Sequence, residues 1–311
     1  MEISKDIRLY WENIVKISYE NYKKEVAGFN YLPVKSFDDF KRYMSENMAG
    51  INGLVYLEEE ECTAFLLYNV WGENKEVYCN IPEWGYGSIS KQCEKAMSYL
   101  FQKLASDIVN RGTVNFSVHL YAHDIELQRL FSYMEFGIQA ETGICILDDT
   151  NSIDVDLIRE LLKEEVKSRW GEIWCLLEQL IQHLRMSPVF YLGEEFTEEV
   201  YKEFFLDEGT RVFVAENNDE IIGVIESNSD NISLLFSDAE AANVGEVYVL
   251  PEYRGKNISH ALLHYAKQKI LQSNYRYAWV EHGTANPNAR YFWNRYFSTY
   301  KYEMTRRINK I

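Results

Sequence analysis

The residues with the clearest capacity for chemistry lie in one short segment, residues 253–259, which read YRGKNIS. The segment follows an apolar run that ends at Pro251, and it leads into an amphipathic pattern that predicts a helix from Ile258. The main-chain N–H groups of such a turn, together with the free amides at the start of a helix, form a binding site for an anion. Arg254 and Lys256 add positive charge at the same place. The segment therefore predicts a site for a phosphorylated cofactor.

This segment resembles the acetyl-CoA signature of the GNAT superfamily of acyltransferases. In that signature an Arg or Gln is followed three positions later by Gly and five positions later by Gly or Ala. Here the three positions hold Arg254, Asn257 and Ser259, within the frame V-x-P-x-Y-R-G-K. Asn tolerates a left-handed backbone better than other non-glycine residues, and Ser is small enough for close backbone approach. We expect the loop to form, with a weaker affinity for the cofactor than the glycine pattern gives.

The downstream residues are similar to the same family. A strand pattern at residues 279–282 precedes Asn286-x-x-Ala289-x-x-Phe292, and a last strand pattern follows. The resemblance implies two neighbouring parallel strands that splay apart, so that the pantetheine arm of acetyl-CoA inserts between them. It implies these cofactor-binding residues: Val247, Tyr248, Val249, Arg254, Gly255, Lys256, Asn257, Ile258, Ser259, Asn286 and Trp293. For Asn286, a helix N-cap and a cofactor contact are equally consistent with the pattern.

The resemblance and the chemistry of amines together suggest a mechanism. A protonated alkyl amine must lose a proton before it attacks a thioester, and a carboxylate or histidine can remove that proton. Candidate bases are Glu246, on the strand expected to hold the cofactor, and Glu281 or His282, on the adjacent strand. The oxyanion would be met by a main-chain N–H of the strand, and an acid would return a proton to the thiolate.

The identity of that acid is open. The family commonly places a tyrosine acid directly after its Asn-x-x-Ala-x-x-aromatic run, where this chain has Trp293. An indole N–H is not a useful proton donor, so Tyr291 and Tyr296 are the nearby candidates.

Hydrophobic periodicity and turn residues predict the elements that position this segment. In the first half, helix patterns cover residues 6–26, 37–48, 90–109 and 125–134, and strand patterns cover residues 53–57, 63–68, 76–79, 113–121 and 143–147. In the second half, helices are expected at residues 154–185 (with an interruption near Gly171), after Thr197, at 258–271 and from Pro287, and strands at 211–216, 221–226, 232–236, 246–250, 277–282 and 302–308. This order predicts a mixed α/β fold.

The two halves of the sequence also repeat a pattern. Residues 77–84 run into a helix as residues 247–253 do, which indicates duplication. A polar break at residues 148–152 divides the chain into two expected tandem domains, 1–150 and 151–311, both GNAT-like. Residues 85–88 (GYGS) look like a phosphate loop but lack a nearby cation. We therefore expect a degenerate N-terminal domain without cofactor, which either shapes the substrate cleft or mediates formation of a homodimer.

Composition limits the binding partners and the cell compartment that we expect. The formal net charge of −16 disfavours binding to nucleic acid or to an anionic membrane surface and favours a cationic substrate. The five cysteines form no CxxC pair, and no apolar run has membrane-spanning length, so a cytoplasmic protein is expected. His260 and His264 have zinc-binding spacing without an evident third ligand, so no metal is expected.

These expectations combine into one function with two alternatives. The function is transfer of an acetyl group from acetyl-CoA to a primary amine of a small molecule or aminoacyl compound in a ternary complex. The first alternative is a non-catalytic acyl-CoA-binding or regulatory module, favoured by the departures at Asn257, Ser259 and Trp293. The second is an aminoacyl transferase that uses charged tRNA, which the net charge argues against.

Overall fold

The computed structural model describes residues 2–72, 76–148, 157–191, 196–229, 234–236 and 240–309. It divides into two compact units. Unit 1 contains Met1–Glu141 and Thr299–Ile311, and unit 2 contains Thr142–Ser298. The last strand of the chain therefore belongs to the first unit. The expected domain boundary at residues 148–152 lies mostly outside the described residues and stays a prediction.

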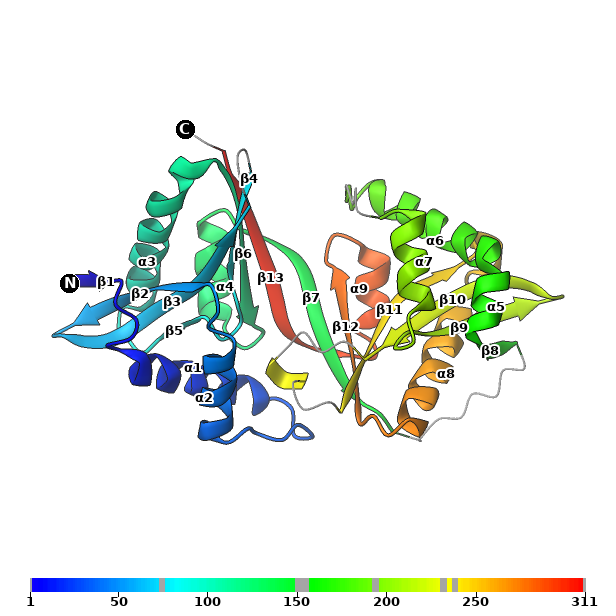
Figure 1. Cartoon of the computed structure of the whole chain (residues 1–311), viewed down its shortest axis with the longest axis horizontal. Coiled ribbons are helices and arrows are strands. Elements are labelled where there is room, and N and C mark those ends of the chain that lie inside the picture. The colour runs from blue at the N-terminus through cyan, green and yellow to red at the C-terminus, as the bar shows by residue number, and fades with distance from the viewer. Residues whose placement is uncertain are drawn as a thin grey trace. The chain divides into compact units, whose positions relative to one another are not determined.

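Unit 1 is built around one mixed sheet (Figure 1). Its strands are β1 (Glu2–Ser4), β2 (Ile51–Glu58), β3 (Glu61–Trp71), β4 (Glu76–Ile81), β5 (Tyr86–Ser88), β6 (Thr113–Tyr121), the first part of β7 (Gly137–Ile146) and most of β13 (Ser298–Ile308). Its helices are α1 (Trp11–Val26), α2 (Phe37–Glu46), α3 (Cys93–Ile108) and α4 (Ile125–Tyr133). The sheet order is β1-β2-β3-β4-β6-β13-β7, and β5 pairs with β3.

Local sequence explains the helix starts in unit 1. The Ser36 side chain accepts a hydrogen bond from Asp39 N and caps α2 as predicted, and Asp124 caps α4 by accepting from Leu127 N. Helix α1 begins at Trp11, later than predicted, because residues 7–10 form turns. The helices α3 and α4 are joined to β6 by an aromatic cluster of Phe101, Phe116, Phe131 and Phe136.

The two glycines of residues 85–88 allow neighbouring segments of unit 1 to pack closely. Tyr86–Ser88 forms strand β5, so the resemblance of this stretch to a phosphate loop is misleading. A Cβ on Gly87 would lie 2.7 Å from the Ile17 side chain of α1, and a Cβ on Gly85 would lie 2.7 Å from the Leu67 carbonyl oxygen. Only glycine allows these close approaches.

Unit 2 contains mixed parallel and antiparallel strands between two layers of helices. Its strands are β8 (Ile158–Leu161), β9 (Arg211–Asn217), β10 (Glu220–Asn228), β11 (Ala241–Val249) and β12 (Tyr277–Gly283), with the second part of β7 beside β12. Its helices are α5 (Lys163–Ser168), α6 (Trp170–Arg185), α7 (Glu198–Leu206), α8 (Ile258–Gln272) and α9 (Pro287–Trp293). Figure 1 shows α6 and α7 on one face and α8 on the other, and each face has its own apolar core.

Two predicted elements of unit 2 are wrong. Residues 158–161 form strand β8 instead of the start of a long helix, because their apolar spacing suits either structure and pairing with β9 decides between them. The expected interruption near Gly171 is confirmed, since Arg169 lies between the end of α5 and the start of α6. Leu234–Phe236 form a 3-10 turn instead of a strand, and residues 232–233 lie outside the described part. The β9–β10 hairpin is confirmed, with Asn218 and Asp219 both at positive φ as its tight turn requires.

Candidate functional site

The predicted site lies in unit 2, where two parallel strands separate. Strands β11 and β12 pair in parallel over three residue pairs, the last of them Asn243 with Trp279. Beyond that pair the described residues form no further ladder, although β11 continues to Val249 and β12 to Gly283. On the β12 side of residues 244–249, the main-chain N–H and C=O groups are therefore not paired with β12, and we call this unpaired stretch the opening. One of its acceptors, the Val249 carbonyl oxygen, takes a hydrogen bond from Arg254 Nε. An extended ligand can pair with these groups as an added strand would.

A bulge distorts β11 at the start of this opening. The register with β10 shifts between Ile225, opposite Val247, and Ser227, opposite Val244. The extra residues are Gly245 and Glu246, and the buried Glu226 carboxylate accepts a hydrogen bond from Glu246 N at 3.1 Å. A Cβ on Gly245 would lie 1.9 Å from Glu226 Oε1, so glycine lets the Glu226 carboxylate keep its place in the bulge. The bulge thus places Glu246 at the start of the unpaired stretch.

Among the described residues, the Glu246 side chain accepts a hydrogen bond from one tyrosine. Tyr201 of α7 donates a hydrogen bond from its hydroxyl to Glu246 Oε1 at 3.1 Å. Burial raises the pKa of Glu246 above its usual value, and the bond from Tyr201 offsets part of that rise. Burial and the Glu246 charge also raise the pKa of Tyr201, so the tyrosine stays a donor. A raised pKa makes the ionised carboxylate a stronger base, as proton abstraction from an ammonium requires.

The turn after β11 has the conformation of an anion site. Pro251–Tyr253 form a 3-10 turn, Gly255 has a φ of 76°, and Asn257 has a φ of 61° directly before α8. The Asn257 prediction is confirmed, because this residue adopts the left-handed conformation. Within the described residues, no side chain caps the first turn of α8 through Asn257, so the amides of that turn are left for a ligand.

Both cations of the turn are held beside it. Arg254 Nε donates to the Val249 carbonyl oxygen at 2.9 Å, and its guanidinium lies 5.0 Å from the centre of the Tyr248 ring. The Lys256 ammonium lies 4.9 Å from the centre of the Tyr253 ring. These contacts hold positive charge at the exposed end of the opening, where a phosphate group would complement it.

The conformation of Asn257 gives a first testable prediction. Asn257→Ala is expected to destabilise the protein by about 1 kcal/mol, because alanine has no local hydrogen bond to favour the left-handed region, whereas Asn257→Gly is expected to leave stability within about 0.5 kcal/mol of the parent. Chemical denaturation of the two variants measures this difference. Equal stability of both variants would contradict the assigned backbone conformation.

Two residues expected to contact the cofactor have clear structural partners. Asn286 caps α9 by accepting from Ala289 N at 3.3 Å, and its Nδ2 lies 3.3 Å from His183 Nε2 of α6. The N-cap role of Asn286 is thus present, and a cofactor contact stays a prediction. Trp293, the last residue of α9, is buried in the apolar core against Phe292 and Phe297, and its contact with a cofactor stays a prediction.

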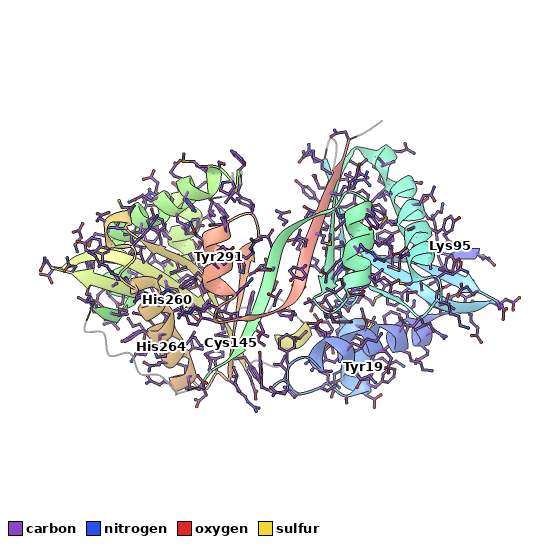
Figure 2. All side chains as sticks on the ribbon, turned by 180° about the vertical axis from the view of Figure 1, so that it is seen from behind. Tyr19, Lys95, Cys145, His260, His264 and Tyr291 are labelled. Atoms are coloured by element: carbon purple, nitrogen blue, oxygen red, sulfur yellow. The ribbon has the colours of Figure 1, made fainter. Side chains whose placement is uncertain are left out.

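The candidate acids and the second base lie elsewhere in unit 2, and Figure 2 labels one of them, Tyr291. Tyr291 is 75% exposed on α9. The Tyr296 hydroxyl is hydrogen-bonded to His260 Nδ1 of α8. His282 is buried near the end of β12. The structure brings Glu246, rather than either tyrosine, to the bulge, and the roles of Tyr291, Tyr296 and His282 stay predictions.

Three residues of this site were missed from sequence. Tyr201 and Glu226 contact Glu246, and Gln179 Oε1 accepts from the Tyr248 hydroxyl at 3.4 Å. No sequence pattern links a helix tyrosine to a strand carboxylate 45 positions away. A glutamate at the end of a strand is also usually solvated.

Among the described residues, no group of three or more His, Cys, Asp or Glu side chains is arranged to hold a metal ion. In that same part of the chain, no helix is long and apolar enough to cross a membrane.

Comparison with known proteins gives one family. Residues 177–297 match the sequence profile of the acetyltransferase (GNAT) family. No curated protein matches the chain in sequence.

Similar solved structures extend over the whole chain. A GCN5-related N-acetyltransferase from Sphaerobacter thermophilus has a TM-score of 0.57 at 11% identity, covering 99% of this chain and 96% of that one. A glucosamine N-acetyltransferase region of a fungal multi-domain β-N-acetylglucosaminidase has a TM-score of 0.55 at 12% identity, covering 99% of this chain and 38% of that one. A GNAT-family acetyltransferase from Colwellia psychrerythraea has a TM-score of 0.50 at 7% identity, covering 99% and 100%. At such low identity the similarity establishes the fold alone.

Proposed function

Because residues 177–297 are a domain of the GNAT acetyltransferase family, we propose that this protein transfers an acetyl group from acetyl-CoA to a primary amine. The observation that carries the proposal is the opening between β11 and β12, which ends at a turn with free helix amides and two cations. A thioester with a diphosphate at its far end fits both features. The diphosphate would lie at the amides of residues 258–259, and the pantetheine arm would pair with residues 247–249.

This arrangement assigns one cofactor site to each chain. In unit 2 the parallel strands separate, but in unit 1 the corresponding parallel pair β4–β6 stays together over six residue pairs, from Glu76 with Thr113 to Ile81 with Val118. A closed ladder has no main-chain groups free for a pantetheine arm. Unit 1 therefore has no equivalent opening within its described strands.

The bulge supplies the proposed base. With the diphosphate at the start of α8, the thioester would lie at the other end of residues 244–249, near Glu246. The Glu246 carboxylate would take a proton from the bound ammonium, and the free amine would attack the thioester carbonyl. A C–N bond forms, the attacking nitrogen releases its second proton to bulk water, and the C–S bond breaks as the tetrahedral intermediate collapses. Tyr291 or Tyr296 would return a proton to the thiolate, and His282 is the alternative base.

The acceptor is proposed to be a small cationic molecule. Glu246 and Glu226 place two carboxyl groups at the bulge, which favours an ammonium over an anion. The formal net charge of −16 attracts cations at longer range and argues against charged tRNA as a donor.

Calorimetry and a thiol-release assay test the proposal. We expect coenzyme A to bind with a stoichiometry of one per chain, and acetyl-CoA to release thiol with at least one member of an amine panel. Arg254→Ala is expected to weaken binding by about tenfold, because a charge-assisted contact contributes about 1.5–3 kcal/mol and solvent exposure reduces it. Absence of coenzyme A binding, or equal binding by the variant, would remove the basis of the proposal. Binding without turnover on any amine would instead favour a non-catalytic acyl-CoA-binding module.

A further inference from the structure

A second hollow lies in unit 1, away from any residue assigned above. Its volume is about 560 Å³, which is within the range of small-molecule sites. It opens on one face of strands β3, β4, β6 and β13, with contributions from Trp71, Tyr78, Asn80, Ser117 and Thr305 among others. Side chains alternate along a strand, so these residues face away from the neighbouring buried residues that pack toward α3 and α4. The hollow is therefore a polar face of the sheet that no core requires.

An aromatic plate forms one wall of the hollow. Trp71 and Tyr78 are cross-strand partners whose rings stack with centroids 5.7 Å apart at 15°. They are nevertheless 50% and 39% exposed. The Tyr78 hydroxyl donates to Glu76 Oε2 at 3.1 Å, and Arg307 Nη2 bonds Glu76 Oε1 at 2.7 Å. Two exposed rings are thus held in a fixed orientation, as a stacking surface for a ligand requires.

The floor of the hollow consists of neutral hydrogen-bonding groups. The Ser117 hydroxyl donates to Asn80 Oδ1 at 2.8 Å. Among the described residues, Asn115 Nδ2 and His119 Nδ1 are buried without a hydrogen-bond partner. Burial and the nearby Lys301 charge lower the pKa of His119 to about 3, so the imidazole is neutral. Asn115 and His119 both line the hollow, so a rotation of either side chain would bring its nitrogen to a ligand hydroxyl. That contact would recover the free energy that an unpaired buried polar atom costs.

Charge pairing in the hollow disfavours an anionic ligand. Arg307 is paired with Glu76, and Arg306 is paired with Glu135 at 2.7 Å. Each guanidinium therefore already has a carboxylate, and Glu303 adds a further acidic side chain to the lining. A phosphate or a nucleic acid would have to compete with these carboxylates in a protein of strongly negative net charge. A purely apolar ring would leave the floor amide and imidazole without partners.

We propose that this hollow binds a neutral polyhydroxylated ring, a hexose unit of a sugar. The apolar C–H face of such a ring would stack on the Trp71–Tyr78 plate. Its hydroxyls, which both donate and accept, would meet Asn80, Asn115 and His119 on the floor. The site is independent of coenzyme A, since all the residues that line it belong to unit 1.

Titration of the full chain with glucose, N-acetylglucosamine and maltose tests the proposal, with glucose 6-phosphate as the anionic comparison. Saturation-transfer NMR detects binding, and calorimetry or tryptophan fluorescence gives the dissociation constants. We expect at least one neutral sugar to bind, and glucose 6-phosphate to bind no more tightly than glucose. Absence of binding by all three neutral sugars, or preference for the phosphate, overturns the proposal.

Variants locate the site. Trp71→Ala is expected to weaken sugar binding by at least about tenfold, a factor that corresponds to one lost stacking partner. Trp71→Phe keeps a ring and is expected to stay within about threefold of the parent. Tyr133→Ala, which removes a 73% exposed ring on α4 outside the hollow, should leave the affinity unchanged.

Two further variants separate a loss of sugar binding from misfolding and from failure of the coenzyme A assignment. If Trp71→Ala lowers the melting temperature, the Asn80→Ala variant tests the site instead, because it removes a polar group of the floor and keeps both aromatic rings. Asn80→Ala is expected to weaken sugar binding by at least about threefold. Arg254→Ala should bind sugar like the parent, so failure of the coenzyme A assignment leaves this test intact. Parent-like sugar affinity in both Trp71→Ala and Asn80→Ala would overturn the site.

Discussion

Glu246→Gln is expected to lower kcat by about 100-fold or more, because general base catalysis typically contributes about 10²–10⁴ in rate. Glutamine keeps the size of the side chain and can still accept the hydrogen bond from Tyr201, so the bulge should persist. The affinity for coenzyme A should stay within about twofold of the parent, since the diphosphate and pantetheine contacts lie on other residues. Steady-state kinetics with the best amine, together with calorimetry, separate these two effects.

The same variant should become more stable at neutral pH. The pKa of Glu246 is raised in the folded protein, so the folded state binds more protons than the unfolded state between the unfolded and folded pKa values. Stability from this group therefore falls as pH rises through that window, and the burial cost of the ionised carboxylate is fully expressed above the folded pKa. Glu246→Gln removes that cost, and thermal melts between pH 4 and pH 8 should show the gain only at the upper end.

The pH profile of the parent gives a related check. Because the carboxylate must be ionised to act as the base, kcat/KM should fall as pH drops through the raised pKa of Glu246. Glu240→Gln is the matched control, since it removes a half-exposed carboxylate directly before the same strand and should change neither kcat nor the profile. If Glu246→Gln keeps parent-like kcat, the base lies elsewhere, and His282→Gln is the next variant to measure.

Local chemistry accounts for the parts of this site that could be predicted. Pro251 ends a strand, Asn257 tolerates a left-handed backbone, and an amphipathic pattern begins at Ile258, so the strand–turn–helix follows from neighbouring residues alone. The caps at Ser36, Thr197 and Asn286 were predictable for the same reason. Each of these features depends on contacts within a few positions along the chain.

The remaining features depend on contacts between distant positions. Strand β13 pairs with β6 of unit 1, although nearly two hundred positions separate Thr305 from its partner Ser117. Strand β8 exists because β9 offers it an edge, and the bond from Tyr201 to Glu246 depends on how α7 packs on the sheet. Periodicity cannot select among such partners, because each strand pattern is compatible with several neighbours.

The departures from the family signature have different consequences in the fold. Asn257 takes the conformation that glycine would take, so the backbone of the turn is preserved. Ser259 lies in the first turn of α8, where a small polar side chain leaves the amides accessible. Trp293 is buried in the core, so its indole contributes packing and not proton transfer. Two of the three departures are thus compatible with cofactor binding, and the third removes the usual acid, while the expected contact of Trp293 with the cofactor stays a prediction.

The position of Ser259 allows a variant that separates cofactor binding from stability. A carboxylate in the first turn of a helix is favourable by about 0.3–1 kcal/mol, because it complements the free amides and the helix dipole. Ser259→Glu should therefore unfold at the same or a slightly higher temperature than the parent. It would also place a negative charge where the coenzyme A diphosphate is proposed to lie, at a cost of about 2–4 kcal/mol. We expect coenzyme A binding to weaken by roughly 30-fold to 1000-fold.

Two uncharged controls identify the cause of that loss. Ser259→Ala matches the small residue of the family signature and should bind coenzyme A as the parent does. Ser259→Gln has the size of glutamate without its charge, so it should lose less than about fivefold if repulsion dominates. Equal losses in the Gln and Glu variants would indicate that bulk, and not charge, blocks the turn. Parent-like binding by Ser259→Glu in calorimetry at low salt would place the diphosphate away from α8, because no screening could then hide two adjacent negative charges.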